Sequence, residues 1–138
     1  LQRLPEWTAV RTRYALLLAQ ALGDSPLLRV PLPPEHLSHA WYKFYAFVKP
    51  EALSDGWSRD RILSEIAGLG YPALSGSCSE IYLEKCFQDA GLGPAERLPV
   101  AQNLGETSLM FQVHPSITPE QMASYVEAVC SVVKRASR

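Results

Sequence analysis

The sequence lacks an excess of charge of either sign. Over 138 residues, 13 Lys and Arg stand against 14 Asp and Glu, which gives a net charge of −1. Proteins that bind nucleic acid or an anionic membrane surface carry a basic excess, so we expect neither partner. No apolar run approaches the roughly 20 residues that a helix needs to cross a bilayer. No secretory signal peptide is visible before the first amphipathic segment, so we expect a cytoplasmic protein.

Cysteine is also scarce. The chain has three cysteines at irregular spacing: Cys78, Cys86 and Cys130. An odd, irregular set is neither a disulfide framework nor a zinc signature, and it fits a reducing compartment. His36 and His39 are three residues apart but have no second pair of ligands nearby. We therefore expect no metal site.

The sequence also lacks the motifs of a complete catalytic centre. Neither the G-x-G-x-x-G nor the G-x-x-x-x-G-K-[ST] phosphate loop is present. Cys78 lies between serines, with no neighbour that would activate its thiol as a nucleophile. We therefore expect no catalytic residue within this chain.

What the sequence does contain is a regular alternation of amphipathic and turn-forming segments. The 47% hydrophobic content and the length suit one globular domain. Periodicity and capping residues predict helices over 6–22, 59–69, 95–104 and from 119 to near the C-terminus, with a short helix between 77 and 91. Ser58 is expected to cap the second of these, Thr118 and Gln121 form a predicted capping box, and Pro99 kinks or resets the start of another.

Strands are fewer and shorter. The aromatic run 39–48 predicts a strand buried on most of both faces, and 71–75 a short second strand. Leu109, Phe111 and Val113 alternate with Ser108, Met110 and Gln112, which predicts a half-buried strand. The proline-rich residues 26–34 predict an extended connector. Few strands among many helices indicate an α+β fold (α/β by looser use), a small sheet covered by helices, with a long first helix that protrudes.

The loop 75–80 is the segment best suited to bind a ligand. Its small residues let backbone N–H groups approach a ligand closely, and its hydroxyls can bind polar groups. A simpler interpretation is a surface turn in which Ser77 or Ser79 caps the following helix. The two roles are not exclusive. Lys43, the charged member of the aromatic run, must reach solvent, an acidic partner or an anionic ligand.

Four local patterns in the same order give the chain a resemblance to a known family. It resembles the C-terminal part of the DegT/DnrJ/StrS family of pyridoxal-phosphate-dependent aminotransferases, which act on nucleotide-linked keto sugars. The patterns are residues 1–14 with Trp7, Arg11, Arg13 and Tyr14; HAWYKFY at 39–45; RDRIL and GLGYP at 59–63 and 68–72; and PAERL, SL, HP and TPEQM between 94 and 122.

The resemblance implies both a fold and an activity. It implies an interdomain helix and connector over 1–36 and, over 37–138, the small C-terminal domain of a fold-type I aminotransferase, with a mostly antiparallel sheet. The family's large N-terminal domain holds pyridoxal phosphate on a lysine, and none of the four lysines here matches that lysine's motif. The resemblance thus implies a C-terminal fragment, inactive alone, of an enzyme that transfers an amino group, with glutamate as the expected donor. Family members are usually homodimers.

The resemblance also suggests site residues, although the chain departs from the family pattern at the segment that contacts substrate. There the family carries a tyrosine- or histidine-bearing segment, and this chain has 74–82 instead. If that segment lines the sugar site, the expected contacts are Ser75, Ser77, Glu80 and Tyr82, with Lys43 as a candidate for a phosphate.

A second hypothesis comes from a different class of protein. The chain could be a free-standing, non-enzymatic α+β module whose aromatic strand and first helix bind a protein partner. Position 1 is Leu rather than Met. An upstream coding region would favour the fragment, and an in-frame Met just before position 1 would favour the module.

Overall fold

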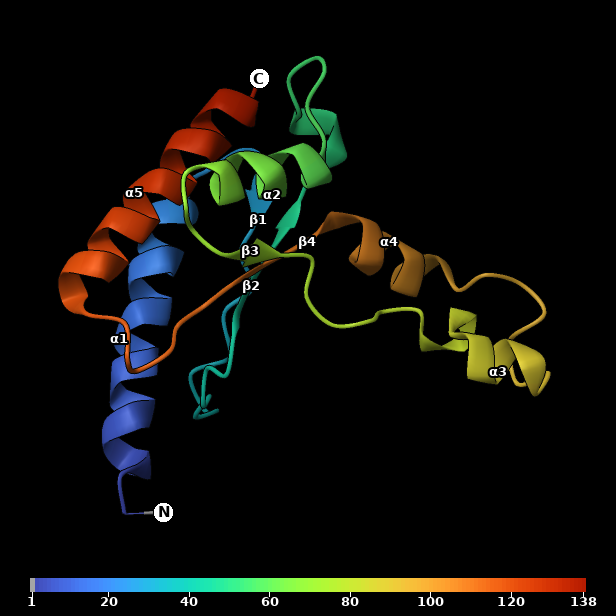
Figure 1. The fold of residues 1–138 in the computed structure, drawn as a ribbon, viewed down its shortest axis with the longest axis horizontal. Helices are drawn as coiled ribbons and strands as arrows, with labels where there is room; N and C mark the ends of the chain where they lie inside the picture. The colour runs from blue at the N-terminus through green and yellow to red at the C-terminus, as the bar shows by residue number, and fades with distance from the viewer. Residues whose placement is uncertain (1) are drawn as a thin grey trace.

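The computed structural model describes residues 2–138, which form an α+β fold of five α-helices and one four-stranded antiparallel sheet (Figure 1). Position 1, which the resemblance includes in the interdomain helix, lies outside the described residues. The helices are α1 (Leu4–Leu22), α2 (Arg59–Gly68), α3 (Lys85–Asp89), α4 (Pro99–Thr107) and α5 (Pro119–Ala136). The strands are β1 (Leu28–Arg29), β2 (Phe44–Val48), β3 (Ala73–Leu74) and β4 (Ser108–Phe111), and short 3₁₀ turns span Pro50–Ala52 and Ile81–Leu83.

The sheet has the strand order β1-β2-β4-β3, and every neighbouring pair is antiparallel. Phe44 of β2 lies opposite Phe111 of β4, and Phe111 lies opposite Ala73 of β3. These side chains join Ile62 and Ile66 of α2 and the buried faces of α1 and α5 in one core. The apolar faces of the three long helices are thus buried against each other and against one side of the sheet.

The predicted helices are largely confirmed, and so are their caps. The Ser58 hydroxyl accepts a hydrogen bond from the Arg61 amide at 3.1 Å. Thr118 and Gln121 form the predicted reciprocal capping box at the start of α5. Pro99 resets the start of α4, so that helix begins four residues later than the predicted 95. This position suits proline, which has no amide hydrogen to donate.

Both main strands differ in burial from the prediction. Strand β2 covers only Phe44–Val48, with buried and half-buried residues alternating, so the expectation of burial on both faces over 39–48 was wrong. One reason is Trp41, whose φ of 49° interrupts the extended chain. Strand β4 is buried at all four positions rather than half-buried. It is a central strand, paired on both sides, and on its second face the Ser108 hydroxyl donates to the carbonyl of Ser75 in the loop that follows β3.

The connector over 26–34 contains a strand that the sequence analysis did not predict. Leu28 and Arg29 pair with Val48 and Phe47 as β1. The Arg29 guanidinium lies 4.2 Å from the centre of the Phe47 ring, a cation–π contact that helps hold the two-residue strand at the edge of the sheet.

Residues 81–98 form an arm that extends away from the sheet, with α3 at its far end (Figure 1). Four large apolar side chains of the arm are exposed: Ile81, Leu83, Leu92 and Leu98. Among residues 2–138, none of the helices is long and apolar enough to cross a membrane.

The core on β4 gives a direct test of this packing. Replacing Phe111, which is fully buried between Phe44 and Tyr125, by alanine is expected to cost about 3–5 kcal/mol of unfolding free energy, because a large cavity remains. The matched control is Leu92→Ala on the arm, where the side chain is 69% exposed and the cost should stay within about 0.5 kcal/mol. Urea denaturation followed by circular dichroism measures both; equal costs would contradict the described core.

Candidate functional site

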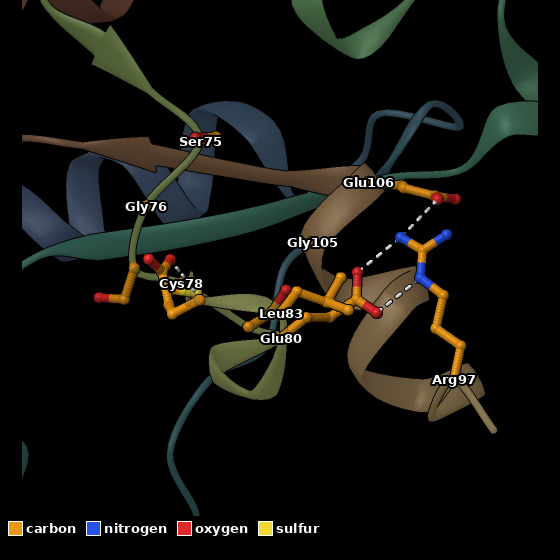
Figure 2. Close-up of a pocket in the computed structure, with 11 residues that line it drawn as sticks. Ser75, Gly76, Cys78, Glu80, Leu83, Arg97, Gly105 and Glu106 are labelled. Atoms are coloured by element: carbon orange, nitrogen blue, oxygen red, sulfur yellow. Dashed lines mark hydrogen bonds and ion pairs between the residues drawn. The ribbon is translucent and has the colours of Figure 1, made fainter. Parts of the chain in front are cut away.

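A hollow of about 370 Å³ lies where the arm joins the sheet (Figure 2). The loop that follows β3 forms one wall, and the C-terminal part of α4 and the residue Arg97 form the other. Its lining residues are Ser75, Gly76, Ser77, Cys78, Ser79, Glu80, Leu83, Glu84, Arg97, Gly105 and Glu106. The hollow is open to solvent and lined by small, hydroxyl-bearing and charged groups.

The first half of the loop is fixed on the side chain of Tyr45 in β2. The Tyr45 hydroxyl accepts a hydrogen bond from the Ser77 amide at 3.3 Å and lies 3.2 Å from the Ser77 hydroxyl. The Ser108 hydroxyl of β4 donates to the carbonyl of Ser75. Between these two anchors Gly76 has a φ of 96°, and a Cβ there would lie 2.5 Å from Cε1 of Tyr45. Only glycine allows the loop to lie this close to the ring.

The second half of the loop packs against α4. A Cβ on Gly105 would lie 2.3 Å from the hydroxyl oxygen of Ser79, so the absence of a side chain there makes room for the loop. The Arg59 guanidinium donates through Nη1 to the carbonyls of Gly105 and Ser108, at 2.9 and 3.1 Å. Arg59 therefore joins the end of α4 to α2, and the wall of the hollow is held from behind.

Glu80 and Arg97 form the strongest polar contact in the hollow. Arg97 donates from Nε to Oε1 of Glu80 at 2.7 Å and from Nη2 to Oε2 at 2.6 Å, a two-bond fork of the kind that charge-assisted pairs favour. The Tyr82 hydroxyl donates to Glu80 Oε1 at 2.6 Å and accepts from the Leu98 amide at 3.0 Å. Glu80 is only 9% exposed. The two ends of the arm thus meet in one hydrogen-bond network.

The network shifts the acidities of its members. The hydrogen bonds from Arg97, and then from Tyr82, lower the pKa of Glu80 from its usual 4.5 to about 2. Loss of hydration raises the pKa of the Tyr82 hydroxyl, and its hydrogen bond to the Glu80 carboxylate raises it further. The carboxylate of Glu80 raises the pKa of Arg97. At neutral pH the network is therefore an ionised carboxylate held by a guanidinium and a neutral phenol.

The remaining charges make the hollow acidic. Glu84 and Glu106 add two carboxylates to that of Glu80, against the single guanidinium of Arg97. The hydrogen bond from Cys78 Sγ to Glu84 Oε1, at 3.4 Å, raises the thiol pKa, so Cys78 stays protonated and is not an activated nucleophile. Such a lining suits the hydroxyls of a polar ligand better than it suits a phosphate.

The structure brings together four of the five predicted site residues. Ser75, Ser77 and Glu80 line the hollow, and Tyr82 lines the adjoining one behind Arg97 while binding Glu80. Lys43 is not among the residues that line either of these hollows. Its Nζ lies 5.4 Å from the ring centre of Tyr42, ahead of β2.

Two important residues were missed from the sequence. Tyr45 lies in the aromatic run 39–48, which the sequence predicts only as a buried strand. Arg97 is separated from Glu80 by 17 positions, so no local motif links that pair. The expected cap by Ser77 or Ser79 was wrong: the 3₁₀ turn that follows has Glu80 at its N-cap and no side-chain cap bond. Within residues 2–138, no cluster of three or more His, Cys, Asp or Glu side chains could hold a metal ion.

Comparison with known proteins gives a consistent result. The sequence matches the DegT/DnrJ/EryC1/StrS aminotransferase family over residues 1–130. The structure is similar to that of an aminotransferase from Psychrobacter cryohalolentis, with a TM-score of 0.91 and 45% sequence identity over 98% of this chain and 36% of that one. S. venezuelae DesV has a TM-score of 0.82 at 20% identity, over 99% of this chain and 34% of its own.

A further structural match is Helicobacter pylori PseC, an aminotransferase involved in the biosynthesis of pseudoaminic acid. Its TM-score is 0.81 at 15% identity, over 97% of this chain and 34% of that one. The chain therefore spans about a third of the length of the proteins it matches. At such low identity the likeness to DesV and PseC concerns the fold.

The ion pair in the hollow predicts a pH dependence of stability. Because the pKa of Glu80 is lowered by folding, its contribution is present above the unfolded value near 4.5 and is lost as the pH falls toward 2. Glu80→Gln should lower Tm most above pH 5, and the difference from wild type should narrow by pH 3. The control Glu106→Gln alters an exposed carboxylate 3.4 Å from Arg97 and should show little of this trend. If the Tm difference between wild type and Glu80→Gln stays constant from pH 7 to pH 3, the prediction is contradicted.

The close contact of the loop with Tyr45 predicts a difference between two glycines. Gly76 and Gly91 both have positive φ, but a Cβ on Gly91 would meet nothing within 4 Å. Gly91→Ala should cost only the backbone strain of about 1–2 kcal/mol. Gly76→Ala should cost about 1–3 kcal/mol more, because the methyl group overlaps the ring. Chemical denaturation of the two variants measures the difference in their unfolding free energies. Equal losses of unfolding free energy would mean that the loop is not packed on Tyr45.

Proposed function

Because the chain belongs to the DegT/DnrJ/EryC1/StrS aminotransferase family, we propose that it is the small, substrate-side domain of a sugar aminotransferase. The complete enzyme would transfer an amino group from an amino acid, glutamate in our proposal, to the carbonyl carbon of a nucleotide-linked keto sugar. The observation that carries this proposal is the match of nearly the whole chain to the Psychrobacter cryohalolentis aminotransferase at 45% identity.

The aminotransferases of this family depend on pyridoxal phosphate, and a putative sugar aminotransferase from Streptococcus pneumoniae with the same fold has a structure in its PLP-form. The hollow described above does not fit that cofactor. A phosphate needs donors and positive charge, whereas the hollow has three carboxylates and one guanidinium that is already paired. Lys43, Lys49 and Lys85 are absent from its lining, as is Lys134. We propose that the cofactor and its lysine belong to a large domain outside this chain, and that the chain alone is inactive.

The chemistry of the hollow supports a role in holding the sugar. The exposed hydroxyls of Ser75 and Ser77 can donate to and accept from sugar hydroxyl groups, and the anchors on Tyr45 and Ser108 keep them in place. Glu80 already accepts hydrogen bonds from Tyr82 and Arg97, so in our proposal Glu80 and Tyr82 shape the wall behind these hydroxyls. Lys43 lies outside the lining of the hollow. In our proposal it remains a candidate to bind a phosphate of the nucleotide.

The proposal includes the large domain as a partner of α1. Trp7, Leu16 and Leu17 are exposed apolar side chains on this helix. They suit a covered rather than a solvated surface. A homodimer, as is usual in the family, and a cytoplasmic location are further parts of the proposal. The three cysteines are free thiols, which is compatible with a reducing compartment.

The proposal is tested with the polypeptide of the complete reading frame, loaded with pyridoxal phosphate. Glutamate should change the visible absorption of the cofactor and release 2-oxoglutarate, and a keto-sugar nucleotide added afterwards should restore the first spectrum and yield an amino sugar. If glutamate has no effect, the donor is wrong or the enzyme carries out a different reaction on the sugar. If the polypeptide binds no cofactor at all, the interaction-module hypothesis replaces this one.

The roles of the serine hydroxyls are tested in the same assay. Ser77→Ala and Ser75→Ala should each raise KM for the sugar nucleotide, roughly 3- to 10-fold for the loss of a hydrogen bond worth about 0.5–1.5 kcal/mol. The rate of the glutamate half-reaction should change little, because glutamate has no sugar hydroxyl groups for these serines to bind. Ser64→Ala on α2, outside the hollow, is the control. An unchanged KM for both variants would remove these residues from the site.

A further inference from the structure

We propose that Arg97 is a positioning residue for the sugar half of the reaction, acting through Glu80 and Tyr82 to fix the loop 75–80 beside the substrate. The inference rests on the proposed function and extends it to a residue at the C-terminal end of the arm. Figure 2 shows the side chain of Arg97, which lies just before α4 in the chain, reaching the carboxylate of Glu80.

The first support is the place of the contact in the chain. The loop ends at Glu80, the arm leaves the sheet there, and the chain returns at Arg97. The Tyr82 hydroxyl bridges Glu80 and the Leu98 amide, so both ends of the arm bind the same carboxylate network. The position of Glu80 therefore depends on a residue that the loop itself does not contain.

The second support is the burial of the carboxylate. Glu80 is only 9% exposed and lies at the base of the loop. With Arg97 removed, an ionised carboxylate would keep one hydrogen bond from Tyr82 and lose both of its strongest donors. Leaving a buried charge without its partner is unfavourable, so Glu80 would turn toward solvent and move the loop with it.

The third support is the coupling of Glu80 to the serines. Only four residues separate Glu80 from Ser75. Of these, Ser77 is hydrogen-bonded to Tyr45, and Ser79 packs closely against Gly105. A shift at Glu80 cannot be absorbed without disturbing these contacts. Displacements of about 1 Å in groups that orient a substrate can reduce catalysis about 100-fold.

The two-bond geometry of the Arg97–Glu80 pair also predicts that lysine cannot fully replace Arg97. Arg97 uses Nε and Nη2 to bind two oxygens of one carboxylate, and Nη2 also lies 3.4 Å from Oε1 of Glu106. Lysine has the charge but presents it as a single point, so it cannot reproduce two parallel bonds. Arg97→Lys should therefore retain only part of the function, between wild type and Arg97→Ala.

The test measures the two half-reactions separately in the complete enzyme loaded with pyridoxal phosphate. Arg97→Ala should lower kcat/KM for the keto-sugar nucleotide about 10- to 100-fold, and Arg97→Lys should fall between it and wild type. The rate of the glutamate half-reaction should stay within about twofold. The matched control is Arg135→Ala, which breaks an ion pair with Glu65 at 3.0 Å between α5 and α2 and should leave both half-reactions unchanged.

A double-mutant cycle shows whether Arg97 acts through Glu80. If it does, adding Arg97→Ala to Glu80→Gln should cost much less than Arg97→Ala does alone. Fully additive effects would overturn the proposal, since they would mean that Arg97 acts independently of Glu80. An equal loss in both half-reactions would also overturn it, because general damage to the fold would explain that result.

Amide hydrogen exchange in the unliganded protein separates this inference from the proposed function. Arg97→Ala should accelerate exchange at the Ser77 amide, which is bound to Tyr45, and Arg135→Ala should not. Unchanged exchange in Arg97→Ala would overturn the positioning role even if the enzyme transfers amino groups. A wild-type protein without amino transfer would instead overturn the proposed function, and with it the catalytic consequence claimed for Arg97.

Discussion

Strand β4 pairs with β2 on one side and β3 on the other, and the candidate site depends on this central position. One of its faces carries Leu109 and Phe111 into the core beneath α2. The other carries the Ser108 hydroxyl, which binds the carbonyl of Ser75 as the chain leaves β3. Both faces of β4 are buried, one in the helical core and one where Ser108 contacts the loop. The packing of the helices is therefore coupled to the place where the serine-rich loop begins.

The loop is then held by contacts of three kinds. Close packing fixes Gly76 on the ring of Tyr45, hydrogen bonds hold Ser77, and an ion pair holds Glu80. None of these contacts comes from the loop alone. A flexible-looking run of glycine and serine therefore becomes an ordered wall, which is the property that a substrate-contacting segment needs if its hydroxyls are to be aimed in advance.

Local signals were enough to predict the helices, because caps and apolar periodicity lie within a few residues of each other. Ser58 and the Thr118–Gln121 pair are examples that the structure confirms. Strand burial was predicted less well, since the alternation at 108–113 gave no sign that the chain at Ser75 would contact Ser108 on the second face of β4. For the same reason Ser75, Ser77 and Glu80 could be grouped from their sequence positions, whereas Arg97, bound from 17 residues away, could not.

The central claim is that the loop 75–80 faces the sugar in the complete enzyme. The most direct test is a structure of that enzyme, loaded with pyridoxal phosphate, in complex with its amino-sugar nucleotide. We predict that a sugar hydroxyl lies within about 3 Å of the hydroxyl oxygen of Ser75 or Ser77, a hydrogen-bond distance, with the Glu80–Arg97 fork intact behind them. A sugar bound elsewhere, with both serine hydroxyls exposed only to solvent, would contradict the account.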